Sequence, residues 1–215
     1  MSFGEAQLRI TAAPLVIKDR IIVGASGGDS GVRDWIAGLD AATGKVLWRK
    51  FTIPAPGEPG SETWKDTNNA WQTGGAALWV TGTYDPDTNQ TIWGTGNPVP
   101  MFDPTYRPGD NLYTNSAISW DPETGNMNWY FQYTPGDLWD YDEVGTHILI
   151  DTEVEGQPRK TPAEAKKIES EPPTWSPTGP LSLEKMTRVS SSRSRARKRS
   201  RMRPIVRSMR VTMAA

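Results

Sequence analysis

Residues 121–143 read DPETGNMNWYFQYTPGDLWDYDE: a polar turn, an aromatic strand, a Pro-Gly pair and an acidic, aromatic end. Aromatic residues favour strands, which predicts one over Trp129–Tyr133. The acidic cluster, Asp140, Asp142 and Glu143, holds three carboxylates within four residues. If the backbone there is extended, Asp140 and Asp142 point to one side. Like charges held that close repel unless a proton or a cation lies between them. The alternative is a solvated acidic loop.

The turn that opens this stretch occurs three times in the chain. Counted from Asp40, Asp85 and Asp121, a Thr follows at three residues, a Gly or Asn at four and a Trp at eight. Asp caps turns, Gly and Asn accept the left-handed conformation, and the Trp would pack from the returning strand. The starts lie 45 and 36 residues apart, near the ~40–45-residue period of a four-stranded propeller blade. The repeat therefore favours an all-β partial β-propeller of about four blades over a β-sandwich.

Outward from these turns, short apolar runs alternate with Gly- and Pro-rich loops. The Gly-rich loop, residues 24–35 (GASGGDSGVRDW), would let backbone amides approach a ligand closely. A long Pro- and Gly-containing loop follows at residues 54–71. The runs predict strands over Leu15–Ile17, Ile21–Val23, Trp35–Leu39, Val46–Phe51 and Ala77–Thr83.

Composition supports a turn-rich β protein with an aromatic core, because ten Trp, 20 Gly and 18 Pro accompany only 36% hydrophobic residues. The sequence has no Cys, which excludes disulfides and thiolate metal sites within the chain. We expect no membrane span, because no apolar run approaches ~18 residues. The first residues, MSFGEAQLRI, also lack the basic and apolar regions of a secretion signal.

Charge divides the chain into two segments. Residues 1–160 contain 11 Lys or Arg against 21 Asp or Glu, whereas residues 161–215 contain 13 against 4. The second segment is Pro-rich and then basic, with too little apolar surface to offset its ordering entropy. We therefore predict a partial propeller over residues 1–160 and a disordered basic tail over residues 161–215, which a shifted reading frame would explain. The Arg run could instead contact phosphates, but out-of-frame GC-rich codons also produce such runs, so we expect no nucleic-acid partner.

Five motifs resemble one known family. They are GASGGDSGVR, the TGK-x-x-W turn, PAPGEPGSETW, WGTGNPVPMFDPTYRPGDNLYTNS and FQYTPGDLWDYDEVGTH. In this order they resemble the quinoprotein alcohol dehydrogenases of the methanol/ethanol type, which use pyrroloquinoline quinone (PQQ), over roughly residues 8–160. That family folds as an eight-bladed propeller with the cofactor on its axis. The resemblance implies that this chain is an incomplete propeller, which we expect to be inactive by itself.

The resemblance also implies roles for individual residues. Asp140 matches the catalytic base, and Trp79 matches the indole on which the quinone stacks. The groups that match hydrogen-bond partners of the cofactor's carboxylates are Thr11, Ser26, Gly27 and Gly28. The matching metal ligands are Asp29, where most members have Glu, together with Asn97, Asp140 and Asp142. Each has a structural alternative: a tight turn for the Gly-rich loop, a turn former for Asn97 and core packing for Trp79.

The implied activity is oxidation of primary alcohols to aldehydes by metal-assisted hydride transfer to the quinone. Asp140 would accept the hydroxyl proton. The parent enzyme would be periplasmic and would pass electrons to a cytochrome c. A lanthanide is favoured over calcium, because Asp142 adds a carboxylate typical of the lanthanide-using branch and a trivalent ion gains more from it. The alternative is a non-catalytic propeller that serves as a binding module, which accounts for the repeat but not for these site residues in family order.

Overall fold

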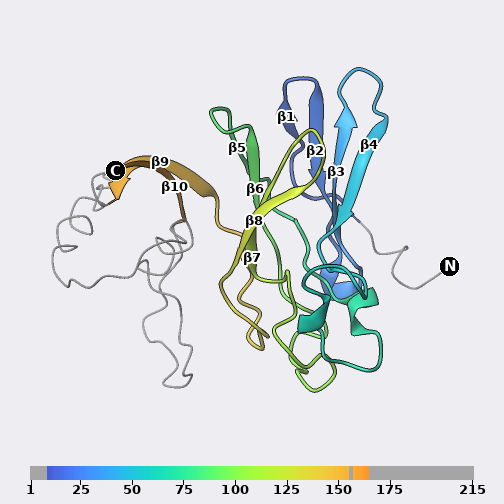
Figure 1. Ribbon diagram of the computed structural model, residues 1–215. Coiled ribbons are helices and arrows are strands. Elements are labelled where there is room, and N and C mark those ends of the chain that lie inside the picture. Colours follow the sequence, from blue (N-terminus) through green and yellow to red (C-terminus); the bar gives the residue numbers. More distant parts are fainter. Residues whose placement is uncertain (1–8, 155–156, 165–215) are drawn as a thin grey trace, which may run out of the picture. The chain divides into compact units, whose positions relative to one another are not determined.

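The computed structural model describes residues 9–154 and 157–164, which form two four-stranded antiparallel sheets and one hairpin (Figure 1). The first sheet consists of β1 (Leu15–Ile17), β2 (Arg20–Gly24), β3 (Trp35–Asp40) and β4 (Val46–Phe51), paired in chain order. The second sheet pairs β5 (Thr83–Asp85), β6 (Gln90–Gly94), β7 (Ser116–Trp120) and β8 (Met127–Gln132) in the same way. The hairpin joins β9 (His147–Val154) to β10 (Gln157–Glu164). Short 3₁₀ helices occur in the loops at η2 (Gly28–Ser30), η3 (Ser61–Thr63) and η4 (Ala70–Thr73).

The all-β prediction is confirmed, but the predicted number of about four blades is wrong. The described residues contain two four-stranded sheets and a hairpin. The three repeat turns are not equivalent: those at Asp40 and Asp121 join the third and fourth strands of their sheets, whereas that at Asp85 joins the first and second. The structural repeat therefore extends from the turn at Asp40 to the turn at Asp121. The long connections at residues 52–82 and 95–115 contain the residues that further blades would need.

The predicted turn chemistry is confirmed. Asp40 Oδ1 accepts hydrogen bonds from the Thr43 amide and hydroxyl, both at 2.7 Å. Asp121 Oδ1 accepts from the Glu123 amide at 2.8 Å. The fifth residues have the expected left-handed backbone, with φ of 72° at Gly44, 52° at Asn89 and 69° at Gly125.

The predicted strands are observed with small shifts of their ends, except one. Residues 77–82 are not a strand, and β5 begins only at Thr83. The Leu78 amide donates to Ala25 O at 2.9 Å, and Ala77 O accepts from the Gly96 amide at 2.8 Å. This segment is therefore held between loops of both sheets rather than in a strand ladder.

The core lies between the two sheets. Ile22 and Ile36 of the first sheet belong to one buried cluster with Trp93, Ile118 and Trp120 of the second. Trp93 is fully buried and its Nε1 donates to Thr91 Oγ1 at 2.7 Å. The predicted role of Trp93 in packing is thus confirmed.

The Trp48 side chain, on the first sheet, packs against the second sheet. Its Nε1 donates to Pro122 O, in the β7–β8 turn, at 3.1 Å. A Cβ added at Gly38 or at Gly125 would overlap the Trp48 ring, so the indole lies between two glycines of different sheets. The repeat thus places a ring on one sheet against the turn glycine of the next.

In each sheet the tight turns lie at one end and the long connections at the other (Figure 1). The long connections contact one another through backbone hydrogen bonds. Asp34 N donates to Gly75 O at 3.2 Å, Gly96 N to Ala77 O at 2.8 Å, and Glu143 N to Thr95 O at 3.0 Å. This end of the two sheets therefore gathers loops that are as far apart in sequence as those of Asp34 and Glu143.

The predicted disordered tail lies outside the described residues, apart from residues 161–164, which belong to β10. No helix in the described ranges is both long and apolar enough to cross a membrane.

Candidate functional site

The Gly-rich loop forms one wall of the candidate site. Its ends are joined by a hydrogen bond from Ala25 N to Trp35 O at 2.8 Å, and its middle forms η2, on which Asp29 is exposed. A Cβ at Gly28 would lie 3.1 Å from Asp34 Oδ2 and 3.2 Å from Gly75 Cα. A larger residue at position 28 would therefore crowd the neighbouring connection.

Three of the predicted cofactor-binding residues meet beside this loop. Thr11 Oγ1 lies 3.3 Å from both Ser26 Oγ and Trp79 O and can donate its one proton to either. Ser26 is fixed by two backbone hydrogen bonds with Arg9, at 2.8 and 2.9 Å. The Trp79 side chain is 42% exposed, which argues against core packing and leaves part of its ring free to stack on a planar ligand.

Two of the predicted metal-binding residues are in direct contact. Asn97 N donates to Asp142 Oδ1 at 2.6 Å, although the two residues are 45 positions apart. The buried Asn97 side chain donates through Nδ2 to Pro98 O at 3.3 Å, so its oxygen is the atom that could ligate a cation. Asp142 reaches this point from the connection that follows β8.

The backbone at Asp140 and Asp142 is not extended, so the condition for the two side chains to point to one side is not met. Both residues have positive φ, 64° and 26°, so they do not follow the alternation of a strand. Asp137 determines this conformation. It is buried, its Oδ1 accepts from Trp139 N at 2.9 Å, and its Oδ2 accepts from Tyr141 N at 2.9 Å and Asn115 Nδ2 at 2.8 Å.

Sequence reasoning missed Asp137. The available signal was an Asp directly after Pro135-Gly136, since Asp side chains bind backbone amides two residues on and so form turns. Asp137 shapes the segment that carries the predicted base and thus acts as a positioning residue for it.

The carboxylates of the site repel one another. Burial raises the pKa of Asp140, and the charges of Asp29 and Asp137 raise it further. The pKa of Asp142 is raised to about 6: burial raises it most, the charges of Asp140, Asp29 and Asp137 raise it too, and the Asn97 amide opposes the rise. The three predicted acidic ligands therefore lie within one another's electrostatic influence, which a cation would relieve.

Carboxylate and amide oxygens suit a hard cation such as calcium, so the donor types fit the predicted ion. The side chains do not converge fully: no group of three or more His, Cys, Asp or Glu in the described part of the chain is close enough to hold a metal. The structure thus brings Asn97 and Asp142 together, and it places Asp29 and Asp140 nearby without direct contact.

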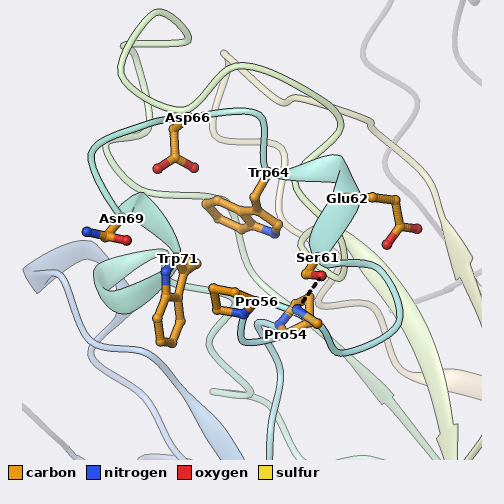
Figure 2. A pocket seen from close by; sticks show the side chains of 9 residues that line it. Pro54, Pro56, Ser61, Glu62, Trp64, Asp66, Asn69 and Trp71 are labelled. Atoms are coloured by element: carbon orange, nitrogen blue, oxygen red, sulfur yellow. Dashed lines mark hydrogen bonds between the residues drawn. The ribbon is translucent and has the colours of Figure 1, made fainter.

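A separate hollow of about 310 Å³ lies in the β4–β5 connection (Figure 2). Trp64 and Trp71 face it together with Pro56, and Glu62 and Asp66 lie at its edge. Arg33 packs behind it, with its guanidinium carbon 4.8 Å from the centre of the Trp71 ring. None of the predicted site residues lines this hollow.

Comparison with known proteins gives one consistent result. Residues 3–170 match the family described as "PQQ: Glucose/ethanol/alcohol dehydrogenase, beta-propeller domain". The chain is 38% identical over 175 residues to a quinohemoprotein alcohol dehydrogenase of Comamonas testosteroni, covering 76% of this chain and 25% of that protein. It is 34% identical over 167 residues to a lanthanide-dependent methanol dehydrogenase of Methylorubrum extorquens, covering 69% of this chain and 27% of that protein.

Solved structures agree with these matches. The crystal structure of the Comamonas testosteroni quinohemoprotein alcohol dehydrogenase superposes with a TM-score of 0.68 at 39% identity, over 74% of this chain and 25% of that one. A europium-containing methanol dehydrogenase gives 0.65 at 35% identity, over 72% and 29% of the two chains. The propeller fold is therefore confirmed. The chain spans about a quarter of the length of these curated relatives.

Proposed function

Since this chain belongs to the β-propeller family of PQQ-dependent alcohol dehydrogenases, we propose that it provides part of the cofactor and cation site of an enzyme that oxidises primary alcohols to aldehydes. The observation that carries the proposal is the 2.6 Å contact between Asn97 and Asp142, with the charges of Asp29 and Asp140 close by. The exposed Trp79, linked through Thr11 to Ser26, lies beside the same Gly-rich loop.

Each side chain has a definite task in this proposal. Asp29, Asn97, Asp140 and Asp142 hold the cation, and Trp79 supports the quinone ring. Thr11, Ser26 and the backbone of Gly27 and Gly28 hold the cofactor's carboxylates. When bound, PQQ supplies the two-electron redox chemistry.

Asp140 takes the proton of the alcohol hydroxyl. It is exposed and therefore accessible to a substrate, and its raised pKa makes it a stronger base than an ordinary aspartate. The turn around Asp137 directs it, because two amides of that turn bind the Asp137 carboxylate.

The cation in this proposal is a lanthanide rather than calcium. Asp142 adds negative charge, which attracts a trivalent ion more strongly than a divalent one. Similarity to a lanthanide-dependent methanol dehydrogenase and to a europium-containing one supports this choice. The electron acceptor in this proposal is a cytochrome c, by analogy with the similar methanol dehydrogenase [cytochrome c] subunit 1 of Methylorubrum extorquens. The proposed location is periplasmic, as the family resemblance of the motifs implies.

A chimeric enzyme tests the proposal. Residues 9–154 replace the matching segment of the Comamonas testosteroni enzyme, and PQQ-dependent dye reduction is measured with a primary alcohol. We expect activity that requires PQQ, does not use NAD, and is lost in Asp140→Asn but kept in Asp19→Asn, which alters an exposed carboxylate in the β1–β2 turn. A folded chimera that reduces NAD, or that keeps its activity in Asp140→Asn, would contradict the proposal.

A further inference from the structure

Asp34 is a buried carboxylate that sequence reasoning did not single out. It directly precedes β3 and has no solvent exposure. Both of its carboxylate oxygens are buried and have no hydrogen-bond partner among the described residues. Its backbone, in contrast, is well fixed: Asp34 N donates to Gly75 O at 3.2 Å, and Asp34 O accepts from the amide and the hydroxyl of Thr52, both at 3.0 Å.

An unpartnered carboxyl group in this position is ionised only when a cation lies nearby. Burying an ionised carboxylate without a partner costs several kcal/mol, so such groups are normally paired, protonated or bound to a cation. The adjacent Arg33 does not serve this purpose. Its Nε and Nη2 donate to Ile53 O at 2.9 and 2.6 Å, and its Nη2 lies 3.5 Å from Glu58.

The neighbouring charge that acts on the Asp34 carboxylate is also negative. Burial, together with the carboxylate of Asp29, raises the pKa of Asp34 to about 8. The two acidic residues lie on either side of Gly28: Asp29 follows it in the chain, and Asp34 Oδ2 would be 3.1 Å from a Cβ placed there. The absence of a side chain at Gly28 thus leaves room for the Asp34 carboxylate to lie directly against the loop.

We propose that Asp34 is a further carboxylate of the cation site, acting on the ion from behind the Gly-rich loop and favouring a trivalent over a divalent ion. The inference rests on the proposed function, which places the ion at Asp29. A buried carboxyl group that serves only structure is hydrogen-bonded, whereas Asp34 is fixed by its backbone and neither of its side-chain oxygens has a partner among the described residues. Because Coulomb attraction scales with the charge of the ion, this carboxylate contributes more to binding a trivalent ion.

Terbium binding to the full chain tests the inference. Tb³⁺ is titrated by its luminescence, sensitised through tryptophan, and Ca²⁺ affinity is obtained by competition. In Asp34→Asn we expect the Kd for Tb³⁺ to rise about tenfold and that for Ca²⁺ to rise less, because one negative charge near the ion is removed. The metal-free variant should unfold at the same temperature as the wild type or a higher one, since the Asp34 side chain has no hydrogen bond to lose. Asp19→Asn is the control for the loss of an exposed charge.

Several outcomes would overturn the inference. They are a Tb³⁺ Kd within about twofold of wild type, equal weakening of Tb³⁺ and Ca²⁺ binding, or a lower unfolding temperature without metal, which would indicate a structural role. Asp34→Ser provides a second neutral variant with the same expectations. Failure of both variants to fold would also contradict the inference, because it predicts no loss of stability without metal.

An Asp142→Asn arm separates the two proposals. If it abolishes Tb³⁺ binding while Asp34→Asn leaves the Kd unchanged, the site stands and the role of Asp34 is wrong. If wild type does not bind Tb³⁺, or if Asp142→Asn binds it as wild type does, the proposed site fails and the inference fails with it.

Discussion

Gly44 and Gly125 provide a matched pair that tests how the two sheets are joined. They occupy the same position of two repeat turns, with φ of 72° and 69°. A Cβ at Gly44 would meet no heavy atom of the described residues within 4 Å. A Cβ at Gly125 would overlap the ring of Trp48, which comes from the other sheet. Alanine therefore strains the backbone equally at both positions but collides with a neighbour at only one.

The expected costs follow from this difference. An alanine in the left-handed conformation costs about 1–2 kcal/mol, so Gly44→Ala should lower the free energy of unfolding by about that amount. Overpacking adds about 1–3 kcal/mol, so Gly125→Ala should lose about 2–5 kcal/mol in total. Urea unfolding of the full chain, followed by tryptophan fluorescence, measures both midpoints, and an unchanged m-value shows that stability alone has changed.

Removal of the obstructing ring completes the test. In a Trp48→Leu background the extra cost of Gly125→Ala over Gly44→Ala should largely disappear, giving a coupling free energy of at least ~1 kcal/mol between residues 48 and 125. Equal destabilisation by the two glycine substitutions, or independent effects of residues 48 and 125, would refute the docking of Trp48 between the sheets.

Three further predictions concern the site. In the chimera, Asp142→Ala should abolish lanthanum-dependent dye reduction and spare calcium-dependent activity; equal activity with both ions, unchanged by the substitution, would argue against a lanthanide. Without metal, the free energy of unfolding should fall as pH rises from about 4 to about 8, because the raised pKa values of Asp34 and Asp142 make the folded state bind more protons than the unfolded state there. Urea titrations across this range measure the slope, and a rising stability would contradict the raised pKa values. Asp137→Ala should cost about 1–3 kcal/mol, because it leaves the buried Asn115 amide without its acceptor; an unchanged midpoint would show that Asp137 does not hold the segment that follows β8.

Local chemistry made much of the fold predictable. The turns at Asp40, Asp85 and Asp121 are determined by side chains and backbone angles within five residues, and the structure has them as expected. The number of blades was not predictable in this way, because three similar turns occupy two different places in their sheets. A turn motif shows which residues can form a chain reversal, but it does not show which pair of strands that turn connects.

Site residues that belong to a sequence motif were predictable, whereas those whose position depends on packing were not. The resemblance brought Asn97 and Asp142 into one set of residues, and the structure has them in contact. Asp34 looks in sequence like any polar residue before a strand. Its placement depends on backbone hydrogen bonds with Thr52 and Gly75, which come from later parts of the chain. Asp137 likewise depends on Asn115, which comes from the connection before β7.

The most direct test of the proposed site is a titration of the full chain with PQQ in the presence and absence of La³⁺, followed by quenching of tryptophan fluorescence. The account predicts tight, saturable binding that requires the ion. It also predicts that Trp79→Ala weakens this binding strongly, because the partly exposed indole supports the quinone, whereas Trp71→Ala, in the separate hollow, leaves it unchanged. Binding that is absent, independent of the ion or indifferent to Trp79→Ala would contradict the central claim.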